Sequence, residues 1–197
     1  MHEILIGVDE AGMGPWAGPL TVGVVVLPEN VVIPGVQDSK KLKDEGRENL
    51  VDSIHQTALF YYVLATGPEN IDQFGISACW NGLVRQVIDK AREHFPDART
   101  IVDGNRIVPF VKNYCPVVKA DDKYQCVSAA SILAKYHQCG WMDDYHLEYP
   151  QYGFNKHRGY GTVQHKKALE IHGPCPAHRK SYKPIKKLLS LPCGSRH

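Results

Sequence analysis

Two apolar, β-branched segments near the start of the chain, residues 3–9 and 19–27, constrain the fold most strongly. The second contains LTVGVVVL, which is almost continuously apolar. A short run of this kind is typical of a strand that is buried on both faces, because a strand with one face in water alternates apolar and polar residues. We therefore expect a sheet that is covered on both sides.

Strands and helices alternate after this first pair. Helices are expected over 43–57, 69–95 and 124–147, and short helices over 163–172 and 183–190. One strand is expected over 58–66, a second ends at Asp103, and a third ends at about Lys119. Residues 150–162 are rich in glycine and predict a loop. The length of 197 residues fits one domain with a small appendage. The pattern predicts an α/β fold in which helices flank a mixed sheet.

The small net charge of +2 hides a strongly uneven distribution. Residues 1–150 carry 13 basic and 20 acidic side chains, whereas residues 151–197, here called the basic tail, carry 10 basic side chains and one acid. A boundary near residue 150 is therefore expected. An acidic body with a basic tail favours a polyanionic partner such as nucleic acid.

Acidic residues follow three of the expected strands. Asp9 and Glu10 end the first strand, Asp103 ends another before Gly104, and Asp121 follows the CPVVK strand. Open α/β sheets place their sites at the carboxyl ends of strands. Clustered carboxylates repel one another unless cations bind between them, and oxygen ligands favour Mg²⁺ or Mn²⁺. Two such ions can hold the attacking and leaving oxygens of a phosphodiester.

Simpler interpretations exist for each acid taken alone. An Asp before a Gly is more often a turn former than a ligand. In an isolated strand Asp9 and Glu10 point to opposite faces, although twist at the strand end can bring both to one site. Physical arguments alone do not choose between Asp121 and its neighbour Asp122, a possible solvated charge at a helix start.

The six cysteines form no CxxC pair and have no zinc-ligand spacing. The N-terminus has no basic leader, and Asp9 and Glu10 interrupt its apolar run, so it does not resemble a signal peptide. No segment approaches the roughly 20 apolar residues needed to span a membrane. We expect a cytoplasmic protein with reduced thiols and no membrane association.

Six sequence blocks resemble the ribonuclease HII family in order and spacing, over essentially the whole chain. They are DEAGMGPWAGPL (9–20), DSKKL (38–42), VDGN (102–105), KADDKYQCVSAASILAK (119–135), YPQYGFNKHRGYGT (149–162) and HGPCPAHRKSY (172–182). The resemblance implies an RNase H-like catalytic domain over 1–150 and a C-terminal helical segment over 151–197 that packs on it and contributes to substrate binding. It also implies cleavage of RNA in RNA–DNA hybrids and incision 5′ of ribonucleotides embedded in duplex DNA, as in ribonucleotide excision repair, leaving a 3′-hydroxyl.

The resemblance assigns metal binding and catalysis to four acids: Asp9, Glu10, Asp103 and Asp121. It selects Asp121 over Asp122, because the family's acid is the first one after the Lys-Ala pair. All four acids are present, which favours an active enzyme with Mg²⁺ or Mn²⁺, two ions acting during catalysis.

The family reads the RNA–DNA junction with a Gly-Arg-Gly turn, whose backbone addresses the ribose 2′-hydroxyl, and with a late tyrosine. The turn corresponds to Gly12, Met13 and Gly14, and the tyrosine to Tyr160. Without the resemblance, Tyr160 is equally well explained as a loop aromatic that caps the core. Met13 replaces the family's arginine, so we expect weaker substrate binding with the junction preference retained.

Further substrate contacts are expected from basic residues. The resemblance places Ser39 and Lys40 on the nucleic-acid backbone, although a lone Lys-Lys pair is usually a solvated helix start. Arg158 and His157, beside Tyr160, are candidates for phosphate contacts. Basic-tail residues that could line a duplex groove are Lys166, Lys167, Arg179, Lys180, Lys183, Lys186 and Lys187, interleaved with His165, His172 and His178. Lys183, Lys186 and Lys187 are taken as the principal clamp.

Two further features qualify the resemblance. Gln138-Cys139 stands where the family commonly has Arg-Asp, which affects local support of the site rather than its four acids. The C-terminal LPCGSRH has no clear sliding-clamp motif, and the family resemblance implies a monomer. Two alternatives remain: another nuclease of the RNase H superfamily, and a weakened relative that binds hybrids without cutting them.

Overall fold

The computed structural model describes residues 3–36 and 44–190. They form two compact units, each built from several stretches of chain. The first unit contains residues up to Ala11, Thr21–Ala65 and Trp80–His137, and the second contains Gly12–Leu20, Thr66–Cys79 and Gln138 onward. The division at residue 150 into a catalytic domain and a binding segment stays a prediction about function.

A five-stranded sheet forms the centre of the first unit. Its strands are β1 (Ile4–Ala11), β2 (Leu20–Pro28), β3 (Phe60–Thr66), β4 (Arg99–Asp103) and β5 (Tyr114–Val117). Their order is β3-β2-β1-β4-β5. β1 pairs antiparallel with β2 and parallel with β4, and β4 pairs parallel with β5. The predicted mixed sheet is therefore confirmed.

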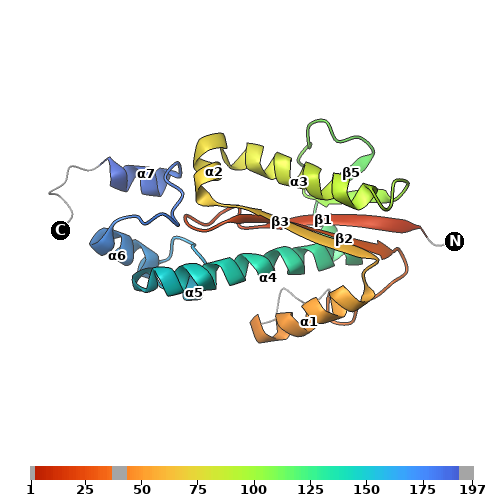
Figure 1. The fold of residues 1–197 in the computed structure, drawn as a ribbon, viewed down its shortest axis with the longest axis horizontal. Helices are drawn as coiled ribbons and strands as arrows, with labels where there is room; N and C mark the ends of the chain where they lie inside the picture. Colours follow the sequence, from red (N-terminus) through yellow and green to blue (C-terminus); the bar gives the residue numbers. More distant parts are fainter. Residues whose placement is uncertain (1–2, 37–43, 191–197) are drawn as a thin grey trace. The chain divides into compact units, whose positions relative to one another are not determined.

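Helices cover both faces of this sheet (Figure 1). α3 (Ile76–Arg92) lies on one face, and α1 (Asp44–Thr57) and α4 (Gln125–Glu148) lie on the other. β2 is buried along almost its whole length, as its continuous apolar sequence predicts. Residues of β1, β2, β4, α1 and α4 share one core cluster, which includes Leu5, Val25, Ile101, Ile54 and Leu133.

Three boundaries differ from those expected from the sequence. The helix expected over 69–95 is two helices, α2 (Pro68–Phe74) and α3, because Gly75 has a φ of 83° and ends the first. The strand expected to reach Lys119 ends at Val117, since Lys119 is left-handed, with a φ of 54°. The expected loop 150–162 contains two short helical segments, η3 (Pro150–Tyr152) and α5 (Phe154–His157).

The second unit packs α6 (Val163–His172) and α7 (Lys183–Leu189) with the last turns of α4. Its core includes Met142, Tyr152, Phe154 and Ile185. Thr162 caps the start of α6, where its side-chain oxygen accepts a hydrogen bond from the His165 N–H.

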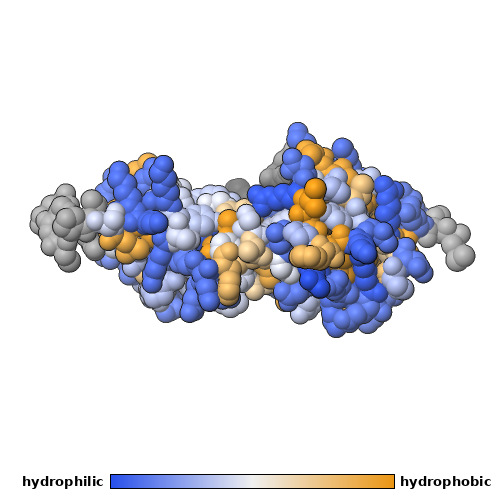
Figure 2. Space-filling model, turned by 90° about the horizontal axis from the view of Figure 1, so that it is seen from above, coloured by the Kyte–Doolittle hydropathy of each residue, from blue (hydrophilic) through white to orange (hydrophobic). Residues whose placement is uncertain are grey.

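Hydrophilic surface predominates around α7, on the left of Figure 2, with a smaller apolar patch beside it. None of the helices in residues 3–36 and 44–190 combines the length and the apolarity that a membrane span requires.

The backbone of α4 approaches the sheet closely at two glycines. A Cβ added to Gly7 of β1 would lie 2.3 Å from the backbone carbon of Cys126, and one added to Gly23 of β2 would lie 2.6 Å from the Ala130 oxygen. Both contacts are with backbone, which cannot rotate away. Small residues on α4, including Ala129 and Ala130, complete the tight contact.

Gly7→Ala is expected to destabilise the protein by at least about 1–3 kcal/mol, because the new methyl overlaps the α4 backbone. Gly82→Ala is the matched control, since it adds the same methyl in the interior of α3, where nothing lies within 4 Å. It should stabilise the protein by about 0.5–1 kcal/mol. Urea unfolding of both variants measures the difference, and equal stabilities would contradict the close approach.

Candidate active site

Two of the acids identified from the sequence, Asp9 and Glu10, lie at the end of the central strand β1. Asp9 is 7% exposed, and its Oδ1 accepts a hydrogen bond from the Glu10 N–H at 2.7 Å. Glu10 is half-buried, and its Oε2 accepts a hydrogen bond from Trp80 Nε1 of α3 at 3.0 Å. Both carboxyls are therefore held by neighbouring groups in the first unit.

The two acids approach opposite faces of the sheet. Asp9 is hydrogen-bonded by Ser131 of α4, which lowers its pKa, whereas Glu10 is bound by Trp80 of α3. α4 and α3 cover different faces (Figure 1). The alternation expected of an isolated strand is thus retained at this strand end.

Asp103 lies at the end of the neighbouring parallel strand β4, one residue beyond the last β1–β4 pair, Val8 with Val102. Its Oδ1 accepts a hydrogen bond from the Ala120 N–H at 2.7 Å. Asp121 is the next residue, in the short 3-10 helix η2 (Ala120–Asp122), and is half-buried. The bond to Ala120 therefore ties the end of β4 to the turn that carries Asp121.

Burial and mutual repulsion disfavour the charged forms of these acids. Burial is the main cause that raises the pKa of Asp9 to about 8, and the charges of Glu10 and Asp103 add to it. Burial also raises the pKa of Glu10, an effect opposed by the Trp80 hydrogen bond and by the positive charge of Arg106. Asp103 contributes to both shifts, so the three carboxyls share one electrostatic environment.

The donor chemistry of this cluster fits a hard divalent cation. Within the described ranges, no group of three or more His, Cys, Asp or Glu side chains is arranged closely enough to hold a metal ion. Asp9, Glu10 and Asp103 nevertheless offer carboxylate oxygens whose repulsion and desolvation a cation would relieve. The residues present therefore fit Mg²⁺ or Mn²⁺ by ligand type.

In the second unit, the turn Gly12-Met13-Gly14 lies beside Tyr160. Gly12 has a φ of 95°, and a Cβ there would lie 2.4 Å from the Pro19 oxygen, so the turn requires glycine at this position. A Cβ placed on Gly14 would lie 3.5 Å from Tyr160 Cε1. The two elements that the family resemblance assigns to junction reading are therefore adjacent.

Tyr160 does not cap the core, because it is 46% exposed. Its loop is fixed to the segment after the turn, where the Trp16 N–H donates to the Gly159 oxygen at 2.8 Å. A Cβ on Gly161 would overlap the Trp16 ring, at 2.1 Å from Cζ2. Rigid backbone on either side therefore presents the tyrosine ring to solvent.

The residues at the second departure from the family, Gln138 and Cys139, are both buried. Gln138 packs against the turn, since a Cβ added to Gly12 would lie 3.5 Å from the Gln138 Cγ. Arg158 donates to the Cys139 carbonyl at 3.2 Å and forms an ion pair with Asp143. The role of Arg158 as a phosphate contact remains a prediction.

The residues that were predicted to bind phosphate differ in exposure, and phosphate binding itself stays a prediction. Lys183, Lys186 and Lys187 are exposed on α7, opposite the buried Ile185. Arg179, His165 and His178 are fully buried, and His157 is 8% exposed, so these four residues do not line a surface. Ser39 and Lys40 lie outside the described residues.

Sequence reasoning missed three side chains that contact the acids or influence their charge: Trp80, Arg106 and Ser131. The guanidinium of Arg106 lies over the Trp80 ring, 5.3 Å from its centroid. Arg106 follows Asp103 by three residues, so proximity in sequence could have suggested it. Trp80 is 70 residues from Glu10 in the sequence, and only the fold brings its indole N–H to the Glu10 carboxylate.

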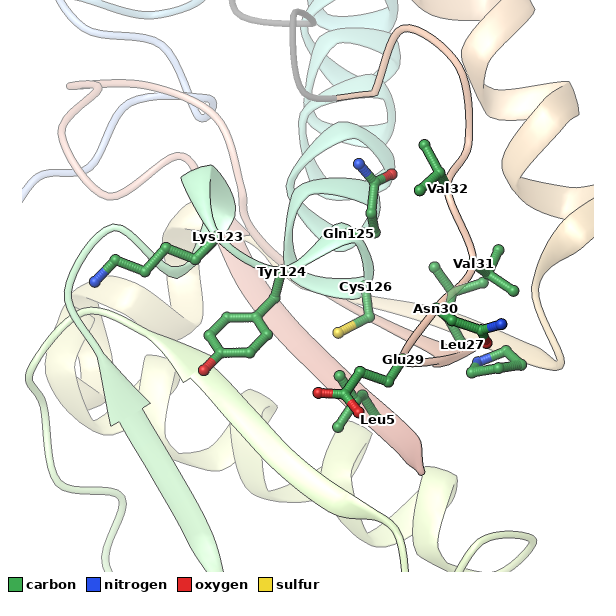
Figure 3. Close-up of a pocket in the computed structure, with 11 residues that line it drawn as sticks. Leu5, Leu27, Glu29, Asn30, Val31, Val32, Lys123, Tyr124, Gln125 and Cys126 are labelled. Carbon is green, nitrogen blue, oxygen red and sulfur yellow. The ribbon is translucent and has the colours of Figure 1, made fainter. Parts of the chain in front are cut away.

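A separate pocket of about 380 Å³ lies in the first unit, near the start of β1 (Figure 3). Leu5, Leu27, Glu29, Tyr124 and Cys126 are among the residues that line it. The acids lie at the other end of β1, so this pocket is not part of the candidate active site.

Comparison with known proteins identifies the family. The model of the family described as "Ribonuclease HII" matches residues 6–185. A curated relative, the ribonuclease HII of Acidovorax sp. strain JS42, is 41% identical over 192 residues, covering 98% of this chain and 91% of the relative. The chain belongs to the ribonuclease HII family.

Solved structures agree with this assignment. The ribonuclease H2 of Pyrococcus horikoshii matches with a TM-score of 0.74 and 28% identity, over 94% of this chain and 96% of that one. The ribonuclease HII of Archaeoglobus fulgidus, solved in complex with PCNA, matches with a TM-score of 0.77 and 25% identity, over 91% and 95%. The RNase H-like α/β fold is confirmed, and this member of the family is a metal-dependent hydrolase of the ribonuclease H class.

Histidines beneath the Tyr160 loop give a prediction for pH. His165 Nδ1 lies 2.9 Å from the backbone carbonyl oxygen of Tyr160, and His165 Nε2 lies 2.9 Å from His178 Nε2. Burial, with the nearby His157, lowers the pKa of His165 to about 4; burial, with His165, lowers that of His178 to about 3. Below about pH 6.5, His165 and His178 are therefore protonated in the unfolded chain but stay neutral in the folded chain. Protonation stabilises the unfolded state, so the free energy of unfolding decreases as the pH falls below 6.5.

Replacing His178 by Asn should reduce the slope of unfolding free energy against pH between pH 6.5 and 5, by up to about 1.4 kcal/mol per pH unit. The wild-type protein provides the reference slope. Urea unfolding at several pH values gives both slopes. An unchanged slope in His178→Asn would contradict the prediction.

Proposed function

We propose that this member of the ribonuclease HII family cuts the RNA strand of RNA–DNA hybrids and incises duplex DNA on the 5′ side of an embedded ribonucleotide, leaving a 3′-hydroxyl. Family membership supports an endonuclease of the ribonuclease H class. The observation that carries the proposal is the shared electrostatic environment of Asp9, Glu10 and Asp103 at the carboxyl ends of two neighbouring parallel strands.

Asp9, Glu10, Asp103 and Asp121 would hold two Mg²⁺ or Mn²⁺ ions. When bound, such ions would supply the positive charge that activates a water molecule and stabilises the departing 3′-oxygen of the scissile phosphodiester. Trp80 fixes the Glu10 carboxyl through its indole N–H, and the Ala120 N–H fixes Asp103. Ordering carboxyls before binding reduces the entropy that is lost when they close on a cation.

Recognition of the ribonucleotide is assigned to Gly12, Met13, Gly14 and Tyr160. The 2′-hydroxyl is the group that distinguishes a lone ribonucleotide within DNA, and backbone groups of a turn can bind it. The exposed Tyr160 ring, adjacent to Gly14, offers a surface for stacking on the neighbouring sugar. Met13 offers no charge to a phosphate, so binding is expected to be weaker than with the family's arginine.

Basic side chains outside the acid cluster are assigned to binding of the duplex. Lys183, Lys186 and Lys187 would bind the duplex backbone, with Ser39, Lys40 and Arg158 as further contacts. We propose a monomer that acts in the cytoplasm in the repair of ribonucleotides in DNA.

The decisive experiment maps the cut in a duplex that carries one ribonucleotide, with Mg²⁺ present. Wild-type protein should incise 5′ of the ribonucleotide. Asp9→Asn, Glu10→Gln and Asp121→Asn should each abolish cutting and spare binding, because each removes one charged cation ligand. Asp122→Asn removes the same charge from the exposed neighbouring residue and should remain active.

Each other outcome identifies an alternative. Cutting of an all-DNA duplex would indicate another nuclease of the superfamily, and binding without incision would indicate a hybrid-binding relative. Full activity of Asp121→Asn together with inactivity of Asp122→Asn would reverse the assignment of the fourth acid.

Replacing Lys183, Lys186 and Lys187 together by Gln should weaken hybrid binding and reduce the slope of log affinity against log salt by up to about 2–3 units, because fewer counterions are released. Lys90→Gln with Lys112→Gln serves as the control, since both residues are exposed and lie in the first unit. Fluorescence anisotropy from low to moderate salt measures the slopes. The same slope in the triple variant and the wild type would place the clamp elsewhere.

A further inference from the structure

Arg179 is fully buried in the second unit, and all five of its N–H donors are used. Nε donates to the Gly18 oxygen at 3.0 Å, and Nη2 donates to the oxygens of Gly12 at 2.6 Å and Pro19 at 3.0 Å. Nη1 donates to the Met13 oxygen at 3.3 Å and to the Tyr182 hydroxyl at 2.8 Å. One side chain therefore holds the carbonyls of a single loop, residues 12–19.

The Tyr182 hydroxyl has a defined direction in this network. A guanidinium can only donate, so the hydroxyl oxygen accepts from Arg179 and its own proton is free for another acceptor. That acceptor is the Met13 carbonyl, at 2.8 Å. The Met13 oxygen is thus held by two donors, one directly from Arg179 and one through Tyr182.

These bonds fix the direction of two backbone N–H groups. In a trans peptide the C=O and the following N–H point in opposite directions, and none of the described residues has a cis peptide bond. The Gly12 and Met13 carbonyls point inward to Arg179. The N–H groups of Met13 and Gly14 therefore point away from Arg179, on the side where Gly14 is exposed and the Tyr160 ring is adjacent.

The charge of Arg179 reinforces this arrangement. All five acceptors of its N–H groups are neutral oxygens, so they solvate the guanidinium without cancelling its charge. The buried positive charge of Arg179 lies on the carbonyl side of the two peptide groups. It favours the binding of an electron-rich oxygen on their N–H side.

The chain that carries Arg179 is itself anchored. Its own N–H donates to the Trp16 oxygen at 2.8 Å, and the Gly18 N–H donates to the Ala177 oxygen at 2.8 Å. Just beyond it, the Asp72 carboxylate accepts hydrogen bonds from the Lys180 N–H and the Ser181 N–H, both at 2.8 Å. The guanidinium is therefore presented from a backbone that is fixed on both sides.

We propose that Arg179 and Tyr182 are positioning residues that aim the Met13 and Gly14 N–H groups at the 2′-hydroxyl oxygen of a ribonucleotide. Neither residue touches the substrate. They act by holding the opposite side of the two peptide groups, so that the donors are oriented before the substrate arrives. This inference rests on the proposed function, because it takes the turn as the reader of the ribose.

Tyr182→Phe tests the proposal with little disturbance. It retains the ring, whose centroid lies 5.1 Å from the Arg179 guanidinium carbon, and removes the hydroxyl that holds Met13. Tyr152→Phe is the matched control. It also deletes a tyrosine hydroxyl that donates to a backbone carbonyl in the same unit, that of Gly173 at 2.6 Å, but it leaves the turn untouched.

The measurement is the ratio of dissociation constants for an all-DNA duplex and the same duplex with one ribonucleotide, with Ca²⁺ in place of Mg²⁺ to limit cutting. Tyr182→Phe should lower this ratio about 3- to 10-fold, chiefly through weaker binding of the ribonucleotide duplex. Arg179→Lys should lower it at least as much, and Tyr152→Phe should leave it at the wild-type value. A loss of fold stability alone would affect both duplexes equally.

Equal ratios for Tyr182→Phe and wild type would overturn the proposal, whether or not Arg179→Lys folds. A wild-type protein that binds both duplexes equally would also overturn it. The wild-type cutting assay in Mg²⁺ is read separately. If the wild type prefers the ribonucleotide duplex and Tyr182→Phe loses that preference, the positioning role holds even where no incision is seen and the proposed function fails.

Discussion

The contact between the α4 backbone and the central strands is the constraint on which the rest of the first unit depends. Gly7 and Gly23 let this helix lie directly on β1 and β2, with no side chain between. That closeness brings Ser131 to Asp9. Shortly before α4, the Ala120 N–H donates a hydrogen bond to Asp103. Residues that form the strand–helix interface thereby set the positions of the acids.

Close packing also sets the electrostatics of the acids. Asp9 is buried beside α4, and this burial is the main cause that raises its pKa to about 8. Such burial destabilises a group of carboxylates unless positive charge is supplied. Arg106 supplies part of it to Glu10, but a single guanidinium next to several acids leaves a deficit. A bound divalent cation, as in the function that we propose, would offset this energetic cost.

Much of this structure could be predicted from the sequence, because its strands and helices carry strong local patterns. The continuous apolar run in β2 and the acids at the ends of β1 and β4 required no knowledge of tertiary contacts. The break at Gly75 was missed because apolar spacing continues across it and gives no sign of a positive φ. The sequence predicts an exposed Arg179 because arginine is rarely fully buried, and the carbonyls that it binds, in residues 12–19, lie at least 160 positions away in the sequence.

The burial of Arg179 also explains how the turn can differ from the family pattern. If the side chain at position 13 were needed to shape the turn, replacing arginine by Met13 would be expected to disturb it. The turn is instead shaped by the φ of Gly12 and by donors on the inner side of its carbonyls. In the recognition that we propose, orienting the backbone N–H groups and binding a phosphate are therefore separate tasks. The first is assigned to the buried Arg179 and the half-buried Tyr182, which are distant from the turn in sequence, so the side chain at position 13 can change while the direction of the N–H groups stays the same.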